Sequence, residues 1–144
     1  MSALYVETSS LLRWIFGEDL AGRVASLIGS TPNPVSSALS LLEAHRAIIR
    51  VRSLDPAAGA AARRADELLT RVSGRWTLAE VSQEIRTRAA RAFPVEPVRT
   101  LDALHLATAL EFGKVYPNLS VLTFDRRILA NLEPLGLARA LTDA

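Results

Sequence analysis

The chain has 144 residues, of which 49% are hydrophobic and 22% are charged, the size and composition of one soluble globular domain. It has no cysteine, which excludes disulfide frameworks, thiolate zinc sites and thiol nucleophiles. The net charge of only +2 does not by itself identify a nucleic-acid partner. All of the cations except Lys114 are arginine, a bias that codon usage explains as well as RNA binding does.

The amino-terminal segment MSALYVETSS has no basic leader and carries Glu7, so we expect no secretory signal there. No apolar run approaches the roughly 18 residues that span a membrane. We therefore expect a cytoplasmic protein that does not enter a membrane.

The first half of the chain predicts one strand followed by helices. Residues 3–6 form an apolar run, and the hydroxyl residues after it favour the start of a helix that ends at Gly17. The residues after Gly29 favour a turn, and the single apolar residue Val35 follows them. The other predicted helices span residues 19–28, 38–52 and 55–72. The helix over 38–52 carries an apolar stripe with Glu43 close to it; the stripe comprises Leu39, Leu42, Ala44, Ile48 and Ile49.

The second half alternates strands and helices. Predicted strands span residues 75–81, 119–123 and 137–141. Predicted helices span residues 83–93, 100–113 with Gly113 at the end, and 126–132. Strands separated by helices need crossover connections. The predicted fold class is therefore α/β, with a parallel central sheet of four to five short strands flanked by helices.

Four acidic residues stand out by position: Glu7, Glu43, Asp102 and Asp125. Glu7 and Asp125 follow predicted strands, at the sheet edge where parallel sheets bind ligands, and Asp102 lies in the first turn of a helix. Each acid alone also has a structural explanation. Asp102 suits the helix dipole, Asp125 suits a helix cap, and Glu43 could pair with Arg46 or Arg50 on its own helix.

A cluster of these acids requires a compensating charge. Two carboxylates about 4 Å apart repel by roughly 4 kcal/mol at an effective dielectric constant of 20. Protons or a cation must relieve that repulsion. Because all four ligands are carboxylates, they favour a hard cation such as Mg²⁺ or Mn²⁺.

Four segments of the chain resemble the acidic motifs of PIN-domain ribonucleases: YVETSSLLRWIFGE, SALSLLEAHRA, LDALHLATAL and VLTFDRRIL. They occur in the family's order from Leu4 to about Leu132, and the length is similar to that of the VapC-like toxins of bacterial toxin-antitoxin pairs. The resemblance implies that residues 1–144 form a single PIN-like nuclease domain. It also implies a metal-dependent endoribonuclease with RNA as substrate and an antitoxin protein as partner.

The resemblance further implies the roles of individual side chains. The metal-binding, catalytic acids are Glu7, Glu43, Asp102 and Asp125. Ser9 and Thr123 are the hydroxyls that orient them. Glu7 departs from the family, whose first acid is usually aspartate, and its extra methylene extends the carboxylate by about one bond length. The water that attacks phosphorus is activated by the metal and by either Asp102 or Glu7.

Arginines are the candidates for contacts with phosphate because the guanidinium group matches phosphate oxygens in pairs. The candidates are Arg99, Arg126 and Arg127, and an ordinary surface position is the competing explanation for each. His105 lies three residues after Asp102 and so invites a metal-ligand interpretation. We favour a buried, hydrogen-bonded histidine, because a hard cation does not prefer imidazole.

The apolar face of residues 11–16 predicts a homodimer, since exposed apolar patches usually mark association surfaces. Trp14, Phe16 and Trp76 are expected in the core or in that interface and not on RNA bases. The alternative function is a PIN-like binding module that acts through its protein partner, with Glu7 marking a degenerate metal site. A phosphoacceptor receiver domain is excluded, because the chain lacks its paired acids after the first strand and its late lysine.

Overall fold

The computed structural model describes residues 2–141, which form a five-stranded sheet in the order β3-β2-β1-β4-β5. Every pair of neighbouring strands is parallel. The strands are β1 (Ser2–Val6), β2 (Pro34–Ser37), β3 (Thr77–Ala79), β4 (Asn118–Leu122) and β5 (Ala138–Arg139). The predicted fold class, a parallel α/β sheet of four to five short strands, is confirmed.

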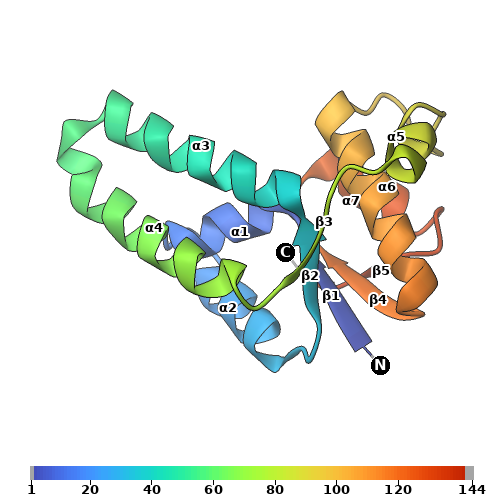
Figure 1. Ribbon diagram of the computed structural model, residues 1–144, viewed down its shortest axis with the longest axis horizontal. Helices are drawn as coiled ribbons and strands as arrows, with labels where there is room; N and C mark the ends of the chain where they lie inside the picture. Colours follow the sequence, from blue (N-terminus) through green and yellow to red (C-terminus); the bar gives the residue numbers. More distant parts are fainter. Residues whose placement is uncertain (1, 142–144) are drawn as a thin grey trace.

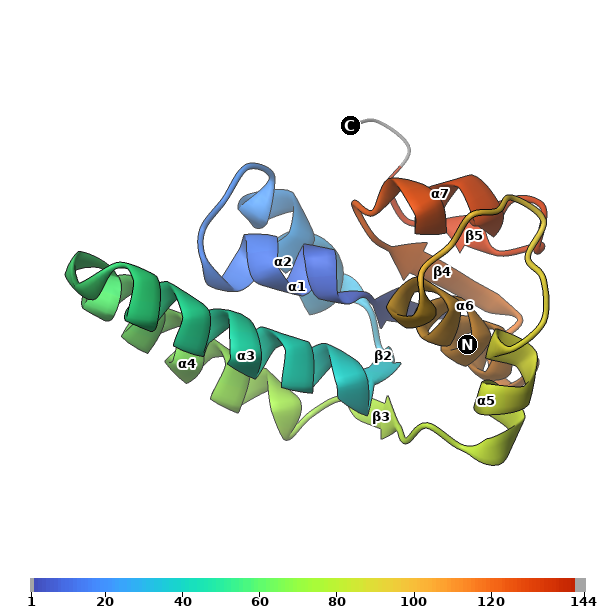
Figure 2. The same ribbon diagram turned by 90° about the horizontal axis from the view of Figure 1, so that it is seen from above.

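Seven α-helices and one short 3-10 helix connect the strands in the described part of the chain. They are α1 (Thr8–Ile15), α2 (Ala21–Ser30), α3 (Ala38–Leu54), the 3-10 helix η1 (Pro56–Ala58), α4 (Gly59–Ser73), α5 (Gln83–Ala89), α6 (Thr100–Val115) and α7 (Arg126–Leu132). The long α3–α4 hairpin projects away from the sheet, and α5, α6 and α7 gather on the other side of the molecule (Figures 1 and 2). None of the helices in residues 2–141 has the length and apolarity needed to cross a bilayer.

Both faces of the sheet are buried, as β1 illustrates. Its residues Leu4 and Val6 belong to a core cluster with apolar residues of α1, α2, α3 and α4. The alternate residues Ala3 and Tyr5 belong to a second cluster with apolar residues of α6 and α7. Since successive side chains of a strand point to opposite faces, the sheet separates the two clusters.

The register of β1 and β4 determines where the strand-end acids lie. Val6 of β1 pairs with Leu122 of β4, the last residue of each strand. The chain therefore leaves both strands at the same level, with Glu7 on one side and Thr123 on the other. The backbone N–H of Glu7 still donates to the carbonyl of Leu122 at 3.0 Å, which fixes this junction.

Some sequence predictions were wrong in detail. On α3, Leu42 and Ile49 are 56% and 46% exposed, because the buried face follows Ser40, Ala44 and Ile48 at four-residue intervals. Helix α6 continues through Gly113 to Val115, since packing on the sheet outweighs the roughly 1 kcal/mol cost of a helical glycine. Helix α5 and strand β3 are shorter than predicted.

The apolar face of α1 is occupied within the chain itself. Leu11 is fully buried, Ile15 is 3% exposed, and Leu12, Trp14 and Phe16 pack against the same core cluster. Leu12, Trp14 and Phe16 stay partly exposed, so the homodimer predicted from residues 11–16 remains a prediction. The buried part of this face packs against α2, α3 and α4. Trp76, 8% exposed, is a core residue as predicted.

Candidate active site

Glu7 lies at the carboxyl end of β1 and begins α1, where its carbonyl accepts from the backbone N–H groups of Ser10 and Leu11. Its side chain is 5% exposed. The hydroxyls of Ser9 and Thr123 both donate to its Oε1 at 2.5 Å. These two hydroxyls accept in turn from the backbone N–H groups of Phe124 and Asp125, which directs their own protons toward Glu7.

Burial raises the pKa of Glu7 above its usual value of 4.5, against the opposing effects of the His105 charge and the hydroxyl hydrogen bonds. Within residues 2–141 no lysine, arginine or histidine forms an ion pair with this carboxylate. A buried carboxylate with only neutral partners favours either a proton or an added cation.

Glu43 has a different environment. Its Oε1 lies 2.8 Å from Nε2 of His105 and accepts from the Thr8 hydroxyl at 2.7 Å. Burial acts to raise the pKa of Glu43, but the hydrogen bonds from His105 and Thr8 and the His105 charge outweigh it, so the pKa is lowered. The expected alternative, an ion pair with Arg46 or Arg50, is not formed in the described structure.

His105 is 2% exposed and joins α6 to β1 and α3. Its Nδ1 lies 2.8 Å from the hydroxyl of Tyr5, while its Nε2 faces Glu43. A proton on Nε2 is donated to Glu43, and the Tyr5 hydroxyl is hydrogen-bonded to Nδ1. The prediction of a buried, hydrogen-bonded histidine is confirmed.

Asp102 and Asp125 are joined by one arginine. Asp102 is 5% exposed in the first turn of α6, and its Oδ2 accepts from the backbone N–H of Arg99 at 3.0 Å. The Arg99 side chain lies 3.5 Å from Oδ2 of Asp102 and 3.8 Å from Oδ2 of Asp125. The other oxygen of Asp125 accepts from the backbone N–H groups of Arg127 and Ile128 and so caps α7.

The four acids are linked through their partners at one edge of the sheet. Thr123 connects Glu7 with the backbone of Asp125, Arg99 connects Asp125 with Asp102, and Thr8 lies beside Glu7 and bonds Glu43. Yet no three His, Asp or Glu side chains in residues 2–141 stand close enough together to hold a metal ion. The oxygen donors and the uncompensated charge of Glu7 fit a hard cation in chemistry, and Arg99 already supplies positive charge between the two aspartates.

Two of the contacts could not be read from the sequence. For the contact between Thr8 and Glu43, the only signal in the sequence is that Thr8 follows Glu7. For the contact between Tyr5 and His105 there is none, because Tyr5 resembles an ordinary strand residue. Of the predicted phosphate contacts, Arg99 is 68% exposed in its side chain and lies against the acids. Arg126 and Arg127 are exposed at the start of α7 and form no ion pair with a described residue.

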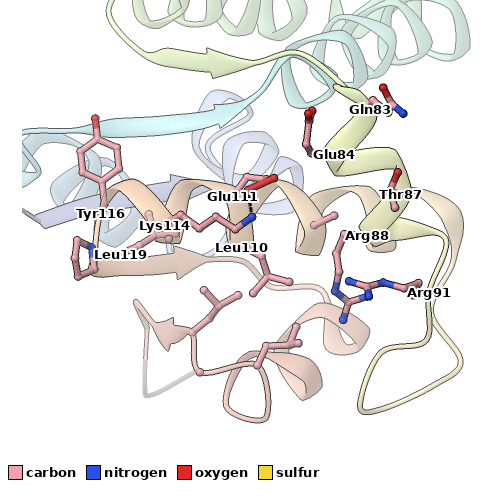
Figure 3. A pocket seen from close by; sticks show the side chains of 16 residues that line it. Gln83, Glu84, Thr87, Arg88, Arg91, Leu110, Glu111, Lys114, Tyr116 and Leu119 are labelled. Carbon is pink, nitrogen blue, oxygen red and sulfur yellow. Dashed lines mark ion pairs between the residues drawn. The ribbon is translucent and has the colours of Figure 1, made fainter.

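A cavity of about 780 Å³ lies apart from these acids, between α5, the carboxyl half of α6 and residues 135–137 (Figure 3). None of the four acids lines it. A second, of about 600 Å³, lies between α5, the loop after it and the start of α6, and Arg99 is one of its lining residues. The smaller groove, and not the larger cavity, therefore adjoins the acids.

The fold agrees with comparisons to known proteins. Residues 4–133 match the PIN domain, and the chain belongs to this family. Ribonuclease VapC35 of Mycobacterium tuberculosis is 34% identical over 137 residues, which are 94% of this chain and 93% of that protein. Ribonuclease VapC46 of the same species is 31% identical over 138 residues, 96% of each. The family predicted from the sequence is confirmed.

Solved structures support the same fold. Mycobacterium tuberculosis VapC20, described as a sarcin-ricin loop cleaving toxin, superposes with a TM-score of 0.60 at 20% identity over 88% of this chain and 93% of that one. A toxin-antitoxin complex from Klebsiella pneumoniae gives a TM-score of 0.60 at 19% identity over 90% and 92% of the two chains. At these identities the likeness concerns the fold alone.

Proposed function

We propose that this protein is a VapC-like ribonuclease toxin of a toxin-antitoxin system, which hydrolyses RNA phosphodiesters with a divalent cation. The family match and the two ribonucleases similar over nearly the whole chain support this function. The observation that carries it is Glu7, a 5% exposed carboxylate at a strand end whose bonded side-chain partners are neutral hydroxyls.

PIN-domain VapC nucleases in general depend on a divalent metal. Here the ligands we propose are Glu7, Asp102 and Asp125, with Glu43 beside them, and the metal we propose is Mg²⁺ or Mn²⁺. A cation held there supplies Lewis-acid activation of water and neutralises charge developing on the phosphate. For these acids to bind one cation, the Arg99 side chain has to move away from Asp102 and Asp125.

The chain's own residues have distinct proposed roles. Ser9 and Thr123 hold one carboxylate oxygen of Glu7 in place. Arg99, once released from Asp102 and Asp125, is positioned to bind the scissile phosphate, and Arg126 and Arg127 offer weaker phosphate contacts at the start of α7. A proton leaving the attacking water passes to Asp102 or to Glu7.

The proposed partners are RNA, an antitoxin protein and a second copy of the chain. One structural neighbour is itself a toxin-antitoxin complex, which supports the antitoxin. The homodimer surface we propose remains residues 11–16, of which Leu12, Trp14 and Phe16 are partly exposed. We further propose that residues 1–144 act as one nuclease domain in the cytoplasm.

The test is metal-dependent cleavage of single-stranded RNA by the wild type, Asp102→Asn and Asp125→Asn. We expect cleavage with Mn²⁺ or Mg²⁺, none with a chelator, and a loss of more than about 100-fold in each variant, since the amide removes a ligand charge. Expression without a partner should arrest growth, and both variants should relieve the arrest at equal abundance while remaining folded by circular dichroism. Variants as active and as toxic as the wild type would contradict the nuclease function.

The second candidate is a binding module acting through its protein partner. The bridge from Arg99 to Asp102 and Asp125 favours it, because the guanidinium occupies the charge that a metal would otherwise balance. In that case the purified wild type cleaves no RNA with either metal, yet still arrests growth through its partner. The two candidates therefore differ in one biochemical assay.

A further inference from the structure

The groove of about 600 Å³ beside α5 combines an apolar floor with a basic rim. Ala89, Val98 and Leu104 are among the apolar residues that line it. The charged lining consists of three arginines and one acid: Arg86, Arg91, Arg99 and Glu96. For a chain with a net charge of only +2, this is a local concentration of positive charge.

Arg99 pairs with Asp102 and Asp125, and no ion pair within residues 2–141 joins Arg86 or Arg91 to the lining acid Glu96. Its Oε2 accepts from the backbone N–H of Phe93 at 2.8 Å and its Oε1 from that of Val98 at 2.9 Å, so Glu96 fastens the loop on which it lies. Arg86 donates one N–H to the carbonyl of Val81 at 2.9 Å, and its guanidinium keeps further donors. Arg91 is exposed and forms no ion pair within residues 2–141.

The groove adjoins the acids of the candidate active site through Arg99. Arg99 lines the groove, and its guanidinium lies 3.5 Å from Asp102 and 3.8 Å from Asp125. An RNA strand whose scissile phosphate lies near Asp102 and Asp125 can therefore extend into the groove.

The larger cavity also carries basic side chains, but none of the four acids or Arg99 lines it. Its Lys114 pairs with Glu111 at 2.7 Å. The Arg88 guanidinium lies 4.2 Å from the centre of the Phe93 ring. Arg91 lines both this cavity and the groove, and Figure 3 labels it beyond the end of α5. The groove therefore differs from the cavity chiefly in its position beside the acids, which it adjoins through Arg99.

We propose that this groove binds the single-stranded RNA that flanks the bond to be cleaved, an inference that rests on the proposed function. Arg86 and Arg91 contact backbone phosphates, since guanidinium groups bind phosphate oxygens in pairs. The apolar floor contacts a base or ribose of the unpaired strand, whose bases are free to lie against protein. The groove thereby positions the RNA, while the acids perform the hydrolysis.

The experiment compares Arg86→Ala/Arg91→Ala with Arg63→Ala/Arg64→Ala. The control pair lies exposed on α4 and removes the same charge away from the groove. Binding of a single-stranded oligoribonucleotide is measured by fluorescence anisotropy at several salt concentrations, with Asp102→Asn in every protein to prevent cleavage. Values of kcat and KM are measured in the otherwise unchanged proteins with Mn²⁺.

We expect the groove pair to weaken RNA binding by about 10-fold, as for two surface ion pairs, and the control pair to leave it nearly unchanged. The slope of log affinity against log salt should fall by roughly 0.7 for each lost phosphate contact. KM should rise with kcat nearly unchanged, because the groove holds RNA without touching the reacting atoms. Arg91→Glu, at a side chain that forms no hydrogen bond with the described residues, should show the same KM effect at an unaltered melting temperature.

Three results would overturn the inference. In the first, the wild type cleaves RNA and the groove pair behaves like the control pair, so the groove fails while the proposed function stands. In the second, both pairs weaken binding equally, which indicates only a general effect of charge. In the third, the wild type neither binds nor cleaves RNA, and the proposed function fails together with the groove.

Discussion

Glu7 and Glu43 are glutamates of the same candidate site with opposite electrostatic environments. Glu7 is 5% exposed, and its bonded side-chain partners are the neutral hydroxyls of Ser9 and Thr123. Glu43 has a 27% exposed side chain and contacts His105 at 2.8 Å. The pKa of Glu7 is raised by burial, whereas the pKa of Glu43 is lowered because hydrogen bonds from His105 and Thr8 outweigh its burial.

The difference indicates which acid most needs an added cation. The His105 ring and the Thr8 hydroxyl already stabilise the charge of Glu43. Hydroxyl donors orient the carboxylate of Glu7, but they carry no charge that offsets its burial. A bound divalent cation would therefore relieve Glu7 far more than Glu43, and the two residues should respond differently to metal.

The largest expected effect is on metal-linked stability, compared between Glu7→Gln and Glu43→Gln. For the wild type, free Mn²⁺ at 100 times its Kd adds about 2.7 kcal/mol to the free energy of unfolding. In a chain of this length that raises the melting temperature by on the order of 10 °C. Glu7→Gln should lose most of this rise and more than about 100-fold in cleavage rate, while Glu43→Gln should keep much of the rise.

The measurement is a thermal melt across a Mn²⁺ titration with a chelated reference. Glu67→Gln, which removes an exposed acid of α4, is the matched control and should behave as the wild type. Without metal, Glu7→Gln should melt above the wild type, because it removes a buried charge while its amide oxygen still accepts from Ser9 and Thr123. The contrast between Glu7 and Glu43 would be contradicted if millimolar Mn²⁺ or Mg²⁺ did not raise the melting temperature of the wild type. It would also be contradicted if Glu7→Gln and Glu43→Gln lost the metal-induced rise equally.

The fold could be predicted where burial and pattern agree. β1 and β4 are apolar runs that end in polar residues, and α7 begins directly after a capping aspartate, so all three were predicted to within a residue or two. β3 and β5 are short and less buried, so their bounds carry a weaker signal. The sequence predicts a helix end at Gly113 because local propensity disfavours glycine, whereas packing of α6 on the sheet decides the outcome.

The candidate site could be predicted in position but not in pairing. Topology alone places Glu7 and Asp125 at one sheet edge. The bond from His105 to Glu43 joins residues 62 apart, and the bridge from Arg99 to Asp125 depends on where α6 begins relative to α7. Periodicity likewise identifies the apolar face of residues 11–16 without saying whether the same chain or a second copy covers it.

A smaller effect is expected from pH in the absence of metal, with opposite signs for the two glutamates. The native pKa of Glu7 lies above 4.5, so its contribution to stability is present below that value and is lost as the pH rises through the native pKa. The native pKa of Glu43 lies below 4.5, so its contribution is present above that value and is lost as the pH falls through the native pKa.

Urea unfolding with a chelator, from about pH 4 to about pH 8, measures both contributions as differences from Glu7→Gln and Glu43→Gln. The free energy of unfolding of the wild type relative to Glu7→Gln should fall as the pH rises. Relative to Glu43→Gln it should fall as the pH drops below about 4.5. Slopes of the same sign in the two comparisons would show that the environments of Glu7 and Glu43 do not differ as described.

The smallest effect is expected from Tyr5→Phe, which reaches Glu43 only through His105. The Tyr5 side chain is fully buried, and its hydroxyl lies 2.8 Å from Nδ1 of His105. Phenylalanine keeps the ring packing and removes one buried hydrogen bond, a loss of about 1 kcal/mol in the free energy of unfolding. His105 still bonds Glu43 through Nε2, so cleavage should fall by less than about 10-fold and the Mn²⁺-induced rise in melting temperature should persist.

Tyr116→Phe, at a partly exposed ring outside this network, is the control and should change neither quantity. If Tyr5→Phe abolished the metal response as Glu7→Gln does, Glu43 and its network would be as tightly coupled to the cation as Glu7, and the contrast between the two glutamates would be wrong.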